Sequence, residues 1–179
     1  MLSLASYLFL RRFRLGNQRR MNWEALGAIA ELIGGVGVVA TLAYLAVQIR
    51  QNTRSVRAST YQNILLTSIE TRRTIAQDEG LAQMMVATRR PLGELDELAL
   101  FRIRNVAVAI LRTFENAHYQ YTRGMIEEML WEPWVANIEH FCRGFGVREL
   151  WPELCPLLNR EFRGYVEATL RRIEAEDAA

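Results

Sequence analysis

The pattern that stands out along the chain is an apolar stretch near the amino terminus. From Leu26 to Ile49 the sequence reads LGAIAELIGGVGVVATLAYLAVQI, and Glu31 is its only charged residue. A helix of this length measures about 36 Å, and the hydrocarbon core of a bilayer is about 30 Å thick. Trp23 and Tyr44 suit the aromatic belts at the two interfaces. The pattern predicts a transmembrane helix over residues 21–50, with a buried helix of a soluble protein as the alternative.

After this stretch the apolar positions recur at helical spacing, without the alternation of strands. The first helix is expected to continue to Gly80 and to carry an apolar stripe of Tyr61, Leu65 and Ile69. Pro and Gly positions then divide the remaining chain into further predicted helices. These cover residues 81–90, 94–128, 133–145 and a last helix that begins near Pro156.

The predicted helix over residues 94–128 has the widest apolar face, which implies burial among several neighbours. We therefore expect it to be the central helix of its domain, and the last helix to pack on the core through Leu158, Phe162, Val166, Thr169 and Ile173. The fold class is predicted to be all-α, with one N-terminal transmembrane helix that continues into a small helical bundle. Three parts result: an appended basic segment (1–20), the transmembrane helix (21–50) and a helical domain (51–179).

Small residues follow one face of the apolar helix at alternating spacings of three and four. Helices in lipid associate by close backbone approach, which small side chains permit. This face predicts a homo-oligomer, and Glu31, close to it, is a costly carboxylate at that depth unless it faces a partner, a water-filled pore or the interface. The residues of the predicted oligomer interface are Gly27, Ala30, Gly34, Gly37 and Thr41.

All 22 basic residues are arginine, and their distribution predicts an orientation. Arg50, Arg54 and Arg57 follow the apolar stretch on one helical face, so for a chain that starts at Met21 the positive-inside rule predicts a cytoplasmic C-terminal domain. Where residues 1–20 are present, their five arginines compete with these three. The same three side chains are candidates for binding anionic lipid headgroups. The net charge of residues 91–179 is −5, which makes nucleic acid an unlikely partner.

No catalytic motif stands out. The absence of lysine excludes Schiff-base chemistry and the phosphate-loop lysine. Arg112 and His118 fit the loose Arg-x(4–6)-His pattern of helical HEPN-type ribonucleases, a pattern that often arises by chance. An ion pair between Arg112 and an acidic residue is the simpler alternative. The two histidines and two cysteines do not have the spacing of a usual metal site, and we expect neither a metal nor a cofactor.

One segment resembles a known family. Residues 23–60, WEALGAIAELIGGVGVVATLAYLAVQIRQNTRSVRAST, are similar to the N-terminal signature of a family of small, uncharacterised bacterial single-pass membrane proteins. Its members share W-E-x-x-G and Y-L-A-x-Q-I-R-x-N-T, the latter at Tyr44–Thr53 here. The resemblance implies a bacterial inner-membrane location and implies no activity.

These observations favour a non-enzymatic protein that self-associates through its Gly-rich transmembrane helix and acts as a scaffold, a sensor or a pore. Two alternatives stay open. One is a membrane-tethered, defence-related HEPN-like ribonuclease that uses Arg112 and His118. The other is a monomeric anchor that holds an interaction domain at the lipid surface. The sequence does not identify a small-molecule ligand.

Overall fold

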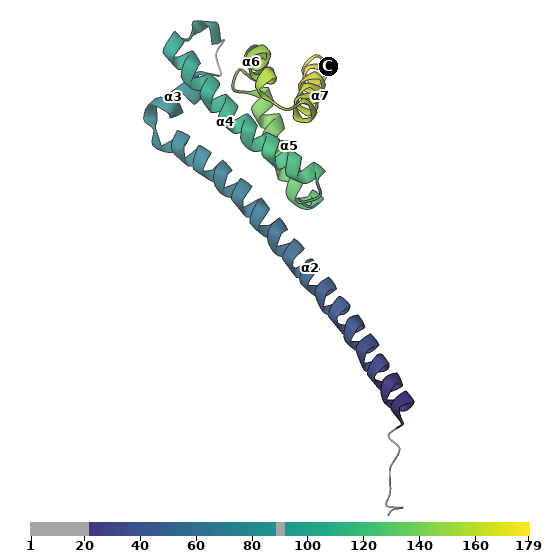
Figure 1. Ribbon diagram of the computed structural model, residues 1–179. Coiled ribbons are helices and arrows are strands. Elements are labelled where there is room, and N and C mark those ends of the chain that lie inside the picture. The colour runs from purple at the N-terminus through teal and green to yellow at the C-terminus, as the bar shows by residue number, and fades with distance from the viewer. Residues whose placement is uncertain (1–21, 89–91) are drawn as a thin grey trace, which may run out of the picture. The chain divides into compact units, whose positions relative to one another are not determined.

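The structure, a computed structural model, describes residues 22–88 and 92–179 (Figure 1). The predicted basic segment over residues 1–20 lies outside these residues. The described part is all-α, with a long apolar N-terminal helix followed by a helical bundle, which confirms the predicted fold class. The chain divides into two compact units, Met1–Gln51 and Asn52–Ala179. Its α-helices are α2 (Trp23–Gln77), α3 (Glu79–Ala87), α4 (Glu97–Thr122), α5 (Glu128–Arg143), α6 (Val147–Leu154) and α7 (Arg160–Asp177).

Helix α2 runs for 55 residues and contributes to both units. As predicted, it continues past Arg50 without a break, because residues 38–79 contain neither glycine nor proline. It ends at Gln77, where the side chain of Asp78 accepts a hydrogen bond from the backbone N–H of Leu81 at 2.9 Å. Asp78 thereby caps the start of α3 and turns the chain.

The apolar half of α2 is uncovered in the first unit. Every residue from Trp23 to Ser59 is exposed. The most apolar 18-residue window of α2 has a mean hydropathy of 2.0, and none of it is buried. By length and composition α2 is able to cross a membrane, whereas the core helix of a soluble protein would be mostly buried.

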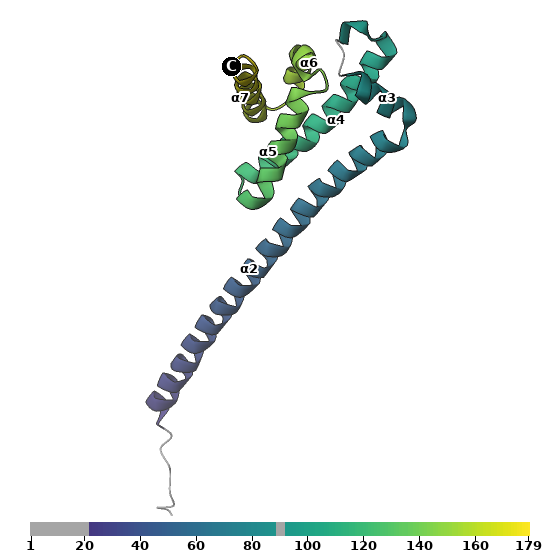
Figure 2. The same ribbon diagram turned by 180° about the vertical axis from the view of Figure 1, so that it is seen from behind.

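In the second unit α4 is the central helix, as predicted. It contacts α3, α5, α6 and α7, and its buried apolar residues are Ile103, Ala107, Leu111, Phe114 and Ala117. Both views show α5 and α7 lying against it (Figures 1 and 2). The helix is shorter than the predicted 94–128. It begins after Asp96, which accepts from the N–H of Ala99 at 2.7 Å, and ends before Gly124, whose φ is +69°.

The inward face of the last helix is also confirmed. Leu158, Phe162, Val166, Thr169 and Ile173 are all buried. The helix begins later than predicted, at Arg160, because the side chain of Asn159 caps it by accepting from the N–H of Phe162 at 2.9 Å. A short 3-10 helix, η3 (Cys155–Leu157), occupies the position around Pro156 where the sequence suggested a start.

Three further predicted details were wrong. Of the expected stripe on α2, Tyr61 packs on the core but Leu65 and Ile69 are exposed, and Ile64 is buried instead. The inward face of α2 includes polar Ser68 and therefore escaped the apolar pattern. The sequence also predicted no helix between residues 146 and 155, where α6 forms, and it placed the start of α5 at Pro133 when α5 begins at Glu128.

Candidate functional site

The predicted oligomer face lies on the uncovered half of α2. Gly27, Gly34 and Gly37 have no heavy atom within 4 Å of the position that a Cβ would occupy, beyond the backbone of their own helix turns. Nothing in the described part of the chain therefore requires these positions to lack a side chain. The hydroxyl of Thr41 donates to the carbonyl oxygen of Gly37 at 2.8 Å, so the polar group on this face is satisfied along the helix.

Glu31 lies beside a shallow groove on another side of α2. Small residues Ala28, Gly35 and Ala40 line this groove together with larger aliphatic side chains. Within the described residues Glu31 forms no ion pair.

The three predicted headgroup-binding arginines are all exposed on α2. Arg50, Arg54 and Arg57 form no ion pair among the described residues. Their spacing of four and three places them on one face, as the sequence indicated. They remain available to solvent or to anions outside the chain.

The structure gives Arg112 and His118 separate environments on α4. The guanidinium of Arg112 donates to Oε2 of Glu115 at 2.6 Å. This ion pair is the simpler alternative to a ribonuclease site that the sequence suggested. Oε1 of Glu115 accepts from the backbone N–H of Asn159 at 2.6 Å. Both carboxylate oxygens are thereby occupied, and Glu115 connects α4 to the start of α7.

His118 is buried in an aromatic cluster. Its ring lies 4.9 Å from that of Tyr165, 5.5 Å from that of Phe162 and 5.8 Å from that of Trp131, measured between centroids. Burial lowers the pKa of His118, and the nearby charge of Glu161 partly opposes this effect. The imidazole is therefore neutral near pH 7 and packs as part of the core. In the described part of the chain no group of three or more His, Cys, Asp or Glu side chains is placed to hold a metal ion.

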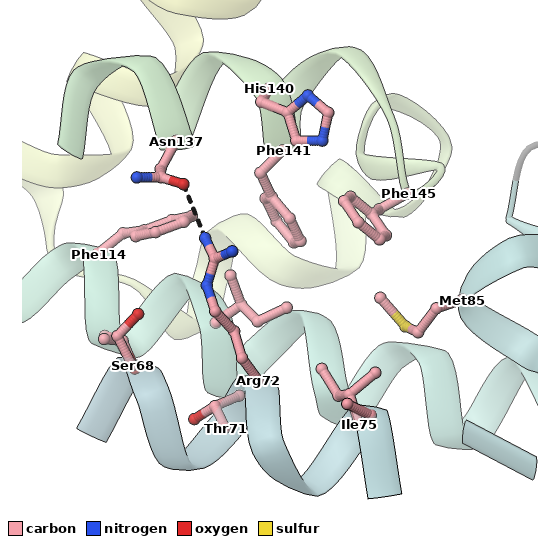
Figure 3. A pocket seen from close by; sticks show the side chains of 13 residues that line it. Ser68, Thr71, Arg72, Ile75, Met85, Phe114, Asn137, His140, Phe141 and Phe145 are labelled. Carbon is pink, nitrogen blue, oxygen red and sulfur yellow. Dashed lines mark hydrogen bonds between the residues drawn. The ribbon is translucent and has the colours of Figure 1, made fainter. Parts of the chain in front are cut away.

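A cavity that the sequence did not predict lies within the second unit. It has a volume of about 270 Å³, near the lower end of the range of small-molecule pockets, about 300–1,000 Å³. Side chains from α2, α3, α4 and α5 surround it (Figure 3). Its apolar lining includes Ile75, Met85, Ile110, Phe114, Phe141 and Phe145.

One side of this cavity is polar. Arg72 extends from α2 toward α5, and its guanidinium donates to Oδ1 of Asn137 at 2.7 Å (Figure 3). Ser68 and Thr71 lie on the same helix and also line the cavity. Because Arg72 and Asn137 are 65 residues apart, no local spacing in the sequence points to this pair.

No protein-family model, curated protein or solved structure matches this chain.

Proposed function

We propose that this protein is a membrane-anchored scaffold that self-associates through the Gly-rich face of α2. In this proposal residues 26–49 cross the bilayer and the second unit lies on its cytoplasmic side. Copies contact one another along Gly27, Gly34 and Gly37, so that their helical domains are held close together.

The observation that carries the proposal is the exposure of the apolar half of α2. Thirteen large apolar side chains between Trp23 and Ile49 are exposed. Burying such a side chain contributes about 1.5–3 kcal/mol, so their exposure to water would cost on the order of 20 kcal/mol. The net stability of a typical domain is about 5–15 kcal/mol. The helix therefore needs a cover on all of its sides, and a bilayer provides one.

Self-association is supported by the glycines. A single helix surrounded by lipid has no need of glycines along one face. The described chain does not need them either, because none of its atoms lies within 4 Å of a Cβ built at Gly34 or Gly37, beyond the backbone of their own helix turns. The polar groups near this face are also satisfied within α2, since the amide of Gln48 donates to the hydroxyl oxygen of Tyr44 at 2.7 Å. A second copy that packs on Thr41, Tyr44 and Gln48 therefore leaves these hydrogen bonds intact.

The orientation rests on charge. Arg50, Arg54 and Arg57 follow the apolar half directly and are exposed, and cytoplasmic flanks are enriched in arginine and lysine. The same arginines lie where they would contact anionic headgroups, at about 1 kcal/mol for each charge. The charge of these three arginines thus supports a cytoplasmic position for the second unit.

The test is the mass of the full-length protein in a mild detergent. One chain has a mass of 20.6 kDa, so we expect particles whose protein mass is a multiple of this value. Replacing Gly34 and Gly37 together by Leu adds side chains to the contact face and should produce monomers. The control is Ala46→Leu, which enlarges a side chain on the side of α2 away from the glycines and should leave the mass unchanged.

A wild-type particle of monomer mass would overturn self-association. So would an unchanged particle mass in the double glycine variant, or an equal loss of mass in Ala46→Leu. Membrane insertion is judged separately, by whether the wild-type chain stays with the membranes after alkaline extraction.

A further inference from the structure

Arg72 is an unpaired charge at the edge of an apolar cavity. Of the described residues that line the cavity, it is the one with a permanent charge. The acidic residues closest in sequence to Arg72 and Asn137 form ion pairs with other arginines. Glu70 pairs with Arg73 at 4.0 Å, and Glu139 pairs with Arg172. The described chain therefore leaves the positive charge of Arg72 without an acidic partner.

Asn137 holds the guanidinium in place. Its amide Nδ2 donates to the carbonyl oxygen of Pro133 at 2.7 Å, which fixes the side chain so that Oδ1 accepts from Arg72. This interaction occupies one of the five N–H donors of the guanidinium. The others stay available to a planar oxyanion, which arginine binds with two parallel hydrogen bonds.

The opposite walls of the cavity suit an apolar group. The ring of Phe114 meets that of Phe141 edge-on at 5.8 Å, and Phe145 stacks on Phe141 at 5.2 Å. Phe145 holds this position with a φ of +56°, a conformation that bulky residues rarely adopt and that is enriched at functional sites. The hydroxyl of Ser68 lines the same space and has no protein partner in the described chain.

From this arrangement we propose that the cavity binds a small amphipathic anion, with its carboxylate or phosphate on Arg72 and its apolar part against the three phenylalanines. Two sources share this chemistry: a free amphiphile with an acidic head, and an anionic membrane lipid. The proposal does not depend on self-association, because every residue of the site lies between Ser68 and Phe145, in the second unit.

The test is equilibrium dialysis of labelled octanoate against the full-length protein in phosphatidylcholine nanodiscs, with empty discs subtracted. We expect saturable binding to the wild type and weaker binding of octanol, which lacks the charge. Charge-assisted hydrogen bonds contribute enough that Arg72→Ala should weaken octanoate binding by about tenfold or more. Asn137→Leu should weaken octanoate binding less, because the guanidinium of Arg72 remains and loses only the hydrogen bond that orients it.

Arg73→Ala is the matched control. Arg73 follows Arg72 directly in α2 but pairs with Glu70 and does not line the cavity, so its removal should leave the affinity unchanged. Arg72→Lys keeps the positive charge but lacks the paired N–H donors of the planar guanidinium, so it should retain part of the affinity for octanoate. Circular dichroism and thermal unfolding of each variant show whether it is folded.

The source is distinguished by repeating the dialysis in discs that contain phosphatidylglycerol. Loss of octanoate binding there identifies the anionic lipid as the occupant, and unchanged binding identifies a free amphiphile. The proposal is overturned if the wild type shows no saturable octanoate binding in phosphatidylcholine discs. Equal affinities for octanol and octanoate, or equal losses in folded Arg72→Ala and Arg73→Ala, would also overturn it.

Discussion

The polar residues of α4 act mainly to position other elements. Glu115 is buried, and its two carboxylate oxygens join Arg112 on the same helix to the backbone of Asn159. Asn159 in turn caps α7. A pattern that resembles a ribonuclease motif in the sequence thus corresponds in the structure to a helix-to-helix connection and a buried histidine.

The burial of His118 predicts a pH-dependent stability. Because burial lowers its pKa, the folded state takes up the proton less readily than the unfolded state, in which the pKa is about 6.5. The free energy of unfolding is therefore expected to decrease as the pH falls through about 6.5, until the folded-state pKa is reached. Thermal unfolding of the full chain in detergent, compared between about pH 7.5 and about pH 5.5, measures this decrease.

The variant His118→Gln cannot take up the proton and should show a smaller decrease between the two pH values. His140, the other histidine of the chain, is exposed, so His140→Gln serves as the control and should behave as the wild type. If His118→Gln loses as much stability on acidification as the wild type, the assigned role of His118 is wrong.

At the scale of elements, the turn between α5 and α6 depends on one glycine. Gly146 has a φ of +59°, and a Cβ there would lie 2.6 Å from Cδ1 of buried Leu92. Gly124, which follows α4, has a similar φ of +69° but open space around it. Substitutions at the two glycines therefore distinguish the cost of a left-handed backbone from the cost of a close contact with Leu92.

We expect Gly124→Ala to lower the free energy of unfolding by about 1–2 kcal/mol, the cost of a left-handed backbone for a residue with a Cβ. Gly146→Ala should cost more, because Leu92 must also move within the core. Denaturant unfolding of both variants in detergent measures the difference. Equal costs would show that the contact with Leu92 does not constrain this turn.

The same turn shows the limit of sequence-based prediction. Apolar spacing correctly predicted the central position of α4 and the inward face of α7, because both helices pack on the core through regular aliphatic and aromatic positions. It missed α6, since glycines before it and Pro152 within it are typical of loops. It also missed the inward face of the later part of α2, where Ser68 and Thr71 line a cavity.

The cavity could not be predicted from sequence patterns. Arg72 and Asn137 meet through the packing of two helices that are far apart in the chain, and neither residue belongs to a motif. The apolar half of α2, by contrast, is recognisable in the sequence, because it is a continuous local run of apolar residues.

At the scale of the whole molecule, α2 contributes residues to both proposed functions, membrane anchoring and anion binding. The first half of α2 provides the apolar segment, and its later part provides Arg72 and Ile75 to the cavity. Residues 38–79 contain no glycine or proline that would interrupt the helix between these two parts. The two proposals thus involve different parts of one helix and can be tested separately.

The claim that residues 26–49 cross a bilayer is tested most directly by cysteine accessibility in intact membrane vesicles. Cys155→Ser gives a suitable background. Cys142 can stay because it is buried and burial raises its pKa to about 12, which keeps the thiol unreactive. Single cysteines are then placed at Val39, in the apolar half, and at Val56, beyond the arginines.

In the structure Val39 is 67% exposed and Val56 is 44% exposed, so in water a cysteine at position 39 should react at least as fast as one at position 56. The account predicts the reverse: a water-soluble maleimide labels position 56 readily and position 39 only after detergent is added. Labelling of position 39 in intact vesicles as fast as position 56 would contradict it.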